Sequence, residues 1–219
     1  MIKLHKGDCP QILVDNAKAW EQALMTYINN GTEYKDVPDS VKNKYNNPEV
    51  KNALLKEANH KCMYCESDIT EAAYYHIEHY RPKSKYPAQS FCWNNLGLSC
   101  QICNGNKSNT FDDTNPFVNP FFDNPDEYFA FCSTMVMSLA GNKRALLSES
   151  VLQLNRPELI EKRSERLKAI RGLAELYAQE DDALIKSIYH KQLEEEISET
   201  KPYSRCMKSA LCEITKEQW

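Results

Sequence analysis

Four cysteines in two close pairs are the clearest chemical feature of this sequence. They form two Cys-x-x-Cys turns, Cys62/Cys65 and Cys100/Cys103, separated by 34 residues. Each turn can present both sulfurs to one point, and four thiolates around one point bind zinc tetrahedrally. The separation is longer than in a usual zinc ribbon, but the pattern still predicts one structural Zn²⁺ held by these four cysteines.

The segment between the two pairs contains harder ligands and a possible base. Glu78 and His79 are adjacent, and Asn104 directly follows the second pair. A carboxylate and an amide suit a hard cation such as Mg²⁺ or Mn²⁺. A histidine with an ordinary pKa of about 6.5 can take a proton from water at neutral pH. We therefore predict two metals, a zinc ion that folds the site and a catalytic divalent cation bound by Glu78 and Asn104.

These residues could together hydrolyse a phosphodiester bond. That reaction needs an activated water, neutralised charge on the phosphate and a stabilised leaving oxygen. Basic residues near the cluster are the candidate phosphate contacts: Arg81, Lys83, Lys85 and Lys107. His76 could orient the site or touch the substrate, or it could only fill the hairpin, and the sequence leaves these alternatives open.

Local patterns indicate the elements that position this cluster. Aromatic and β-branched residues predict a strand from Tyr74 to His79, which Pro82 keeps short. The second cysteine pair should open a short helix on which Asn104 and Lys107 share one face. Residues 1–60 are predicted to be helical support, and 61–112 to be the site itself.

Two helices are expected within the supporting residues 1–60. Asp15 is the predicted cap of the first helix, which should end at the Asn29-Asn30-Gly31 turn. Pro48 should open the second helix, which leads the chain to Cys62.

Residues 113–219 are predicted to begin with turns and continue as helices. Three Asn-Pro pairs between residues 115 and 125 indicate turns, because proline disfavours helix at the residue before it. The stretch from Tyr128 to Leu139 is predicted to be strand. From Ser148 to about Ser198, apolar residues recur at helical spacing, with basic residues first and acidic residues later.

Composition limits the possible partners. The chain has 219 residues, a formal charge of −4 and a pI near 5.8, which argue against a protein that coats nucleic acid non-specifically. The longest apolar-rich stretch, from Tyr128 to Ala140, is shorter than the ~20 residues of a spanning helix, so we predict no membrane partner.

Nine cysteines without a secretory signal indicate a reducing compartment, and we predict a cytoplasmic protein. Five of them lack metal spacing and should be small apolar residues: Cys9, Cys92, Cys132, Cys206 and Cys212.

The ordered motifs of residues 62–107 resemble those of HNH endonucleases of the ββα-metal type. The shared pattern is C-x-x-C, then HIEHYRPKS, then N-L, then C-x-x-C-N-x-x-K. The resemblance implies an α+β protein, mostly helical, with a zinc-clamped ββα core. It also implies His79 as general base, Asn95 as a loop-bracing residue, and Glu78 and Asn104 as metal ligands. Many relatives have histidine at the position of Asn104, and aspartate is commoner at that of Glu78.

A narrower resemblance connects the chain to the HNH subunits of Septu-type anti-phage defence systems, the PtuB family. It rests on HIEHYRPKS, Trp93-Asn94-Asn95-Leu96, the Asn-Pro region and Leu154-Asn155-Arg156. The resemblance implies a nuclease acting on DNA with an ABC- or SMC-like ATPase (PtuA-like). We expect residues 148–219 to form part of that interface, although they could instead pack only on the protein's own core.

Two other functions remain open. A stand-alone McrA-like restriction endonuclease should carry its own recognition domain, and this acidic chain has no obvious one. A non-catalytic zinc-bearing DNA-binding module would not require Glu78, His79 and Asn104 together.

Overall fold

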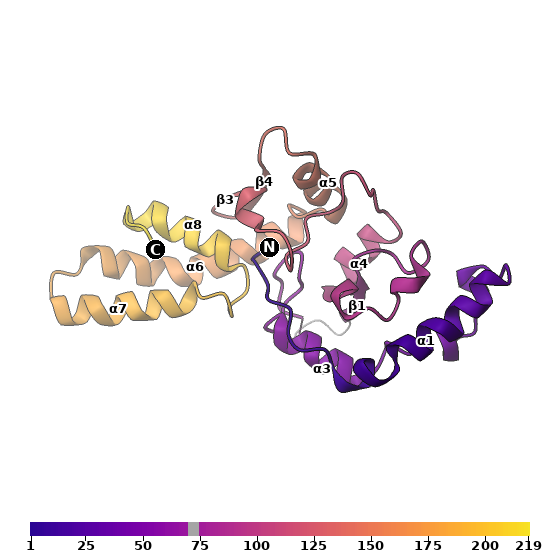
Figure 1. The fold of residues 1–219 in the computed structure, drawn as a ribbon. Helices are drawn as coiled ribbons and strands as arrows, with labels where there is room; N and C mark the ends of the chain where they lie inside the picture. Colours follow the sequence, from indigo (N-terminus) through magenta and orange to yellow (C-terminus); the bar gives the residue numbers. More distant parts are fainter. Residues whose placement is uncertain (70–74) are drawn as a thin grey trace.

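A small ββα unit lies at the centre of the fold (Figure 1). The structure, a computed structural model, describes residues 1–69 and 75–219. Strand β1 (Tyr75–His79) pairs antiparallel with β2 (Leu96–Cys100), and helix α4 (Gln101–Lys107) follows at once. The predicted strand is confirmed from Tyr75 to His79, whereas Tyr74 lies outside the described residues. The hairpin and the short helix that the family resemblance implied are both present.

One glycine brings the first cysteine turn against this hairpin. Gly97 pairs with Glu78 in the sheet, and a Cβ atom at Gly97 would overlap the sulfur of Met63. The amide of Met63 donates to the carbonyl of Leu98 over 2.8 Å. A side chain at position 97 would have to displace the buried Met63 side chain, so glycine allows the two segments to pack this closely.

The N-terminal region is helical, as predicted, but its first helix begins earlier than expected. The elements are α1 (Gln11–Asn29), α2 (Asp39–Lys42) and α3 (Pro48–Glu57). Helix α1 starts after Pro10, whose fixed φ suits a helix start. Asp15 is therefore not the cap, and it accepts a 2.6 Å hydrogen bond from Gln11 on the helix surface. The end of α1 at Asn29 and the start of α3 at Pro48 are confirmed.

The predicted strand from Tyr128 to Leu139 is a hairpin. It consists of β3 (Phe129–Cys132) and β4 (Met135–Ser138), which pair antiparallel. Ser133 has a φ of 52°, the left-handed conformation that reverses the chain between them. Helix α5 (Lys143–Leu152) then begins five residues before Ser148, because the side chain of Asn142 caps it through the Ala145 amide at 3.0 Å.

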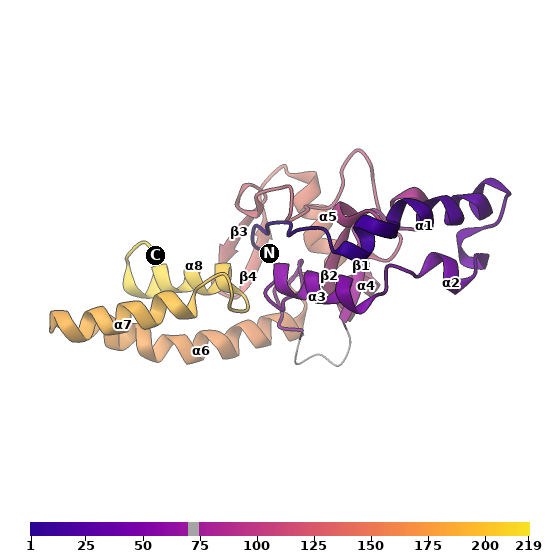
Figure 2. The same cartoon turned by 60° about the horizontal axis from the view of Figure 1, so that its bottom comes forward.

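Three further helices complete the chain. They are α6 (Pro157–Gln179), α7 (Ala183–Glu196) and α8 (Ser204–Thr215). The predicted helical stretch is interrupted before α7, where the Asp182 carboxylate caps the amides of Leu184 and Ile185 at 2.8 and 3.1 Å. Both α7 and α8 pack on α6. These helices and the N-terminal helices extend on opposite sides of the central unit (Figures 1 and 2).

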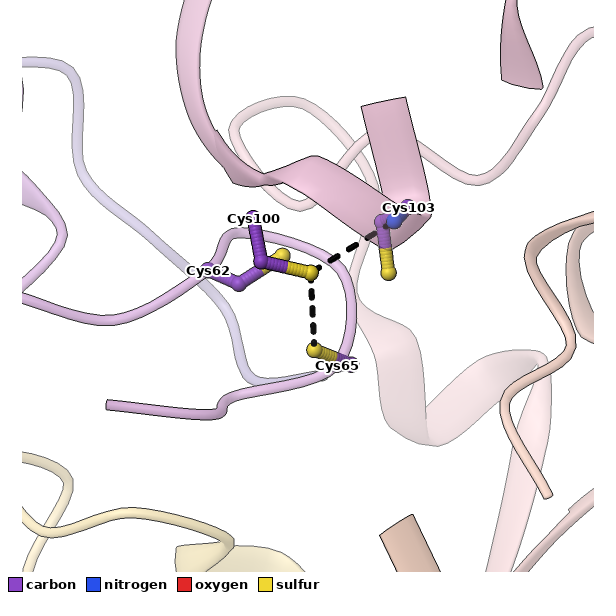
Figure 3. Close-up of side chains that lie close together, drawn as sticks. All are labelled: Cys62, Cys65, Cys100 and Cys103. Carbon is purple, nitrogen blue, oxygen red and sulfur yellow. Dashed lines mark hydrogen bonds between the residues drawn. The ribbon is translucent and has the colours of Figure 1, made fainter. Parts of the chain in front are cut away.

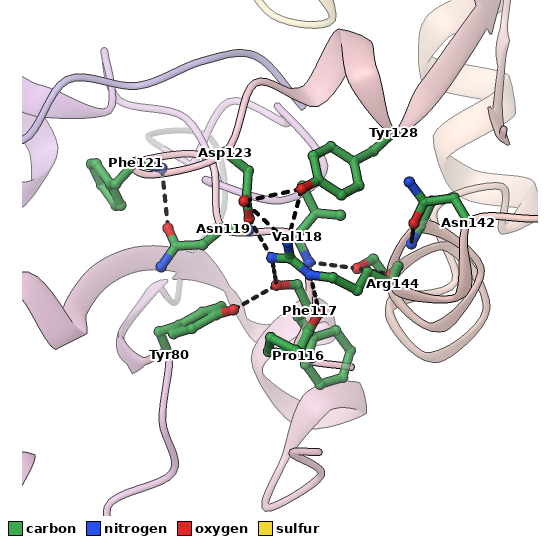
Figure 4. A network of polar contacts seen from close by, with 12 residues as sticks. Tyr80, Pro116, Phe117, Val118, Asn119, Phe121, Asp123, Tyr128, Asn142 and Arg144 are labelled. Atoms are coloured by element: carbon green, nitrogen blue, oxygen red, sulfur yellow. Dashed lines mark hydrogen bonds and ion pairs between the residues drawn. The ribbon is translucent and has the colours of Figure 1, made fainter. Parts of the chain in front are cut away.

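Arg144 on α5 fixes the turn-rich segment against the ββα unit (Figure 4). Its guanidinium forms an ion pair with Asp123 at 2.5 Å and donates to the carbonyls of Pro116 and Phe117 at 2.9 and 3.2 Å. The hydroxyl of Tyr80, directly after β1, donates to the same Phe117 carbonyl at 2.5 Å. Residues on both sides of the predicted boundary at 112/113 therefore share contacts.

The mixed α+β, mostly helical fold class is confirmed. Besides the helices and the two hairpins, the described chain contains short 3₁₀ turns: η1 (Tyr34–Asp36), η2 (Pro87–Gln89), η3 (Trp93–Asn95) and η4 (Pro125–Glu127). Among the described residues, no helix combines the length and the apolar character needed to cross a membrane.

Candidate active site and metal centre

The four cysteines meet at one buried point (Figure 3). Their sulfurs all lie within 4.8 Å of one another, and Cys65 and Cys100 are 3.8 Å apart. Two sulfurs bound to zinc at about 2.3 Å with tetrahedral angles would be separated by about 3.8 Å. Four thiolates at one buried point would repel one another and are costly to desolvate, so they need a cation. The donor set and its spacing fit the predicted structural zinc.

His79 is held at the end of β1 in a defined orientation. Its Nε2 atom lies 3.0 Å from the carbonyl oxygen of Ser90. A carbonyl can only accept, so Nε2 carries the hydrogen and Nδ1 has a free lone pair in the neutral ring. Burial lowers the pKa of His79 to about 3, which keeps the imidazole neutral at physiological pH. The neutral ring therefore has an unprotonated Nδ1, and burial makes it a weaker base than the ordinary histidine that the sequence predicted.

Tyr45 packs edge-on against the His79 ring. The ring centroids are 4.5 Å apart at an interplanar angle of 86°, and Tyr45 is buried. Its hydroxyl contacts the ammonium of Lys83. Tyr45 comes from the region predicted to be only support, so the N-terminal residues also contribute a side chain to the site.

Lys107 lies under the site and forms an ion pair with Glu78. The ammonium is 2.6 Å from Oε1 of Glu78 and donates to the backbone carbonyl of His79 at 2.8 Å. Lys107 is only 1% exposed. The expectation that it faces phosphate at the surface is wrong, because α4 packs this face against β1. Burial raises the pKa of Glu78, and the charge of Lys107 opposes that shift.

Asn95 holds the loop that carries the carbonyl partner of His79. Its side-chain oxygen accepts from the Arg81 amide at 2.7 Å. Its side-chain nitrogen donates to the carbonyls of Arg81 and Gln89, each at 3.1 Å. These bonds tie residue 81 to residue 89, next to Ser90, so Asn95 acts on the geometry of the loop.

Several of the predicted residues line one cavity of about 300 Å³. Its walls come from β1, α4 and the loops beside them: Tyr45, His76, Ile77, Glu78, His79, Pro82, Lys83, Asn104, Gly105, Ser108 and Asn109. The carboxylate and amide of the predicted cation site thus share a cavity with the neutral histidine. Such a pair of oxygen donors, with room for water, suits Mg²⁺ or Mn²⁺.

Arg81 and Lys85 lie away from this cavity. The Arg81 guanidinium is 3.9 Å from the Asp113 carboxylate and packs beside the rings of Tyr86 and Phe111. Lys85 is exposed on the surface. Lys83 is therefore the predicted phosphate contact that the structure places at the cavity.

Three side chains around the site were not expected from the sequence. Tyr45 contacts His79, Tyr64 lies 3.5 Å from Glu78, and Arg156 lies against the cysteine sulfurs. The contacts of Tyr45 and Arg156 join residues far apart in the chain, and no local spacing indicates them. Arg156 does belong to the Leu154-Asn155-Arg156 string on which the resemblance to the PtuB family rests.

Comparison with known proteins agrees with this geometry. Residues 62–110 match the family model of the HNH endonuclease. Septu protein PtuB of Bacillus thuringiensis is 33% identical over 138 residues, covering 60% of this chain and 48% of the relative. Septu protein PtuB of Bacillus mycoides (strain KBAB4) is 35% identical over 157 residues, covering 58% of this chain and 53% of the relative. The chain thus spans about half the length of these curated relatives. Residues 62–110, with their cysteine cluster and ββα unit, are an HNH endonuclease domain.

Proposed function

We propose that this protein is a metal-dependent endonuclease that hydrolyses DNA phosphodiester bonds. The main support is the orientation of His79, whose Nε2–H is held by the Ser90 carbonyl while Nδ1 is unprotonated. His79 shares its cavity with Glu78 and Asn104. A general base beside a carboxylate and an amide is the arrangement that metal-assisted hydrolysis needs.

In the proposed reaction, Nδ1 of His79 takes a proton from the attacking water. The Ser90 carbonyl and the Tyr45 ring keep the imidazole in place during this step. Glu78 and Asn104 would hold a divalent cation, which would stabilise charge on the phosphate and on the leaving oxygen. Lys83 provides a positive charge for the phosphate at the cavity wall. His76 is exposed at the same cavity, where it can contact substrate.

The test is cleavage of DNA by the purified protein with Mg²⁺ or Mn²⁺. His79→Ala should reduce the rate by about 10²- to 10⁴-fold, the usual contribution of a general base. His5→Ala is the matched control, because His5 is exposed. Zinc content should be the same in all three proteins. DNA binding without cleavage by the unchanged protein would instead support the non-catalytic zinc module.

We further propose that the nuclease acts in a Septu-type antiviral defence system with an ABC-type ATPase. The similarity to proteins named Septu protein PtuB supports this assignment. The net charge of −4 also supports it, because an acidic nuclease gains from a partner that supplies DNA contacts. A stand-alone McrA-like enzyme would cleave modified DNA without any partner, so cleavage with and without the ATPase distinguishes the two.

The α6–α7 pair offers an apolar surface for that partner. Four apolar residues of these two helices are exposed: Leu176, Leu184, Ile185 and Ile188. In residues 148–163 the apolar side chains of Leu152, Leu154 and Leu159 instead pack in the core, so only part of the predicted interface remains available. Leu184→Asp with Ile188→Asp should abolish co-purification with the ATPase. Leu146→Asp, at an exposed site on α5, is the control, and retention of the complex by the double variant would contradict this interface.

A further inference from the structure

Arg156 lies against the cysteine cluster from outside the HNH segment. Its two terminal nitrogens are 3.8 Å from the sulfur of Cys103, 3.9 Å from that of Cys65 and 4.0 Å from that of Cys100. The side chain is buried. It also donates hydrogen bonds to the carbonyls of Leu152 and Gln153, at 3.4 and 3.3 Å. Both are longer than an ideal N–H···O hydrogen bond. The guanidinium thus lies between three cysteine sulfurs and two backbone carbonyls.

The charge of a zinc-bound cluster explains why a cation belongs there. Four thiolates and one divalent ion together carry two negative charges. Buried charge is costly unless it is paired, and arginine stays protonated even when buried. Within residues 1–69 and 75–219, Arg156 is the cationic side chain with recorded contacts to these sulfurs. Lys61 is next to Cys62 in sequence, but its ammonium instead approaches Glu66 and the carbonyl of Glu199.

The neighbours of Arg156 fix its position. Gln153 adopts a left-handed conformation with a φ of 50°, which ends α5 and turns the chain back to the core. Asn155 binds both backbone groups of Val136, at 2.9 and 2.6 Å, and so attaches this turn to the β3–β4 hairpin. Leu154 is buried, and Pro157 starts α6 directly after Arg156. The Leu154-Asn155-Arg156 motif therefore presents the guanidinium to the sulfurs.

We propose that Arg156 is a positioning residue of the zinc centre, which balances part of the thiolate charge and slows the release of zinc. The residues after 148 then belong to the unit that zinc folds. This inference concerns the structural metal and does not depend on nuclease activity.

The experiment measures zinc release from the full-length zinc-loaded protein into excess 4-(2-pyridylazo)resorcinol. Arg156→Met should release zinc about 10- to 100-fold faster than the unchanged protein, the usual effect of losing an outer-shell partner. Arg163→Met is the matched control. Arg163 is equally a buried arginine, but its recorded hydrogen bonds go to the Thr134 carbonyl and to Asn155, at 3.0 and 3.5 Å. Each rate is measured at the same interval below the Tm of that variant. Differences in overall stability then do not affect the comparison of zinc release rates.

A second readout reports directly on the sulfurs. In the cobalt-substituted protein, losing the cation should move the sulfur-to-cobalt charge-transfer band to longer wavelength in Arg156→Met but not in Arg163→Met. Arg156→Lys keeps the charge and should release zinc more slowly than Arg156→Met. If the methionine variant fails to accumulate, the lysine variant should still accumulate with zinc bound. Equal release from Arg156→Met and Arg163→Met with an unchanged band would overturn the proposal. A lysine variant that holds zinc no better than the methionine variant would do the same.

Discussion

The cysteine cluster and the His79 cavity are neighbours in the fold but differ in how complete they are. The cluster has four buried sulfurs, and Arg156 lies against three of them. The cavity has a base and two oxygen donors, and about 300 Å³ remains for what must enter from outside. A closed ligand set is typical of structural zinc, whereas a catalytic site keeps open positions. The first region should therefore control stability, and the second should control rate.

The largest effect should come from breaking the closed region. Cys103→Ser removes one zinc ligand, and structural zinc contributes about 10–16 kcal/mol of apparent binding free energy. That is comparable to the whole stability of a typical domain, so the variant should lose zinc and fail to fold. Zinc content and circular dichroism measure this, with the exposed Cys9→Ser as control. A folded, zinc-free and active Cys103→Ser protein would show that the cluster is not a structural metal site.

A substitution of Glu78 tests whether residues of the His79 cavity affect only the rate, or the stability as well. Glu78→Ala removes a proposed metal ligand and also leaves the buried Lys107 without its carboxylate. Activity should be lost, and the free energy of unfolding should fall by about 3–5 kcal/mol, the cost of breaking a buried ion pair.

The double variant Glu78→Ala with Lys107→Met separates the two effects. It should regain most of the stability and none of the activity, because the unpaired charge is gone but the ligand is still missing. Urea unfolding and DNA cleavage are the two measurements. A double variant no more stable than Glu78→Ala would contradict the role assigned to the Lys107 contact.

Tyr45 should have a moderate effect on rate alone. Tyr45→Leu removes the ring that packs on His79, and misplacing a catalytic group can cost up to about 100-fold. The loss should appear in kcat more than in KM, since the imidazole and not the substrate is displaced. Tyr45→Phe keeps the ring and should retain most of kcat, apart from its lost contact with Lys83. If both variants behave alike, the aromatic contact does not position His79.

The last effect appears only when the pH is changed. Burial lowers the pKa of His79 from 6.5 to about 3, so the unfolded chain binds a proton at this residue that the folded chain does not. Stability from His79 is therefore fully present above pH 6.5 and is lost as the pH falls from 6.5 toward 3. The unfolding free energy of the unchanged protein should decline more steeply over this range than that of His79→Asn. Equal pH slopes would mean that His79 titrates alike in both states.

The sequence predicted those features that depend on neighbours along the chain. The cysteine turns, the start of α3 at Pro48 and the strand up to His79 each follow from a few adjacent residues. The place of Lys107 did not follow, because a shared helix face does not reveal whether that face meets solvent or β1. Tyr45 was missed for a similar reason, since its contact with His79 exists only after α2 and α3 have packed. The turn at Ser133 was hidden because its strand-forming neighbours suggested one continuous strand.

The contact between Tyr45 and His79 also determines which residues a functional fragment of this protein would have to include. The family match begins at residue 62, yet the aromatic ring that packs on His79 belongs to Tyr45. Tyr45 lies 34 residues before His79 and outside the match. A fragment cut at the edges of the match would keep both cysteine pairs and His79 but would leave the imidazole uncovered on one side. Residues 62–110 consequently lack one contact that positions His79. If they were grafted into another protein, that protein would have to supply an aromatic residue in the place of Tyr45.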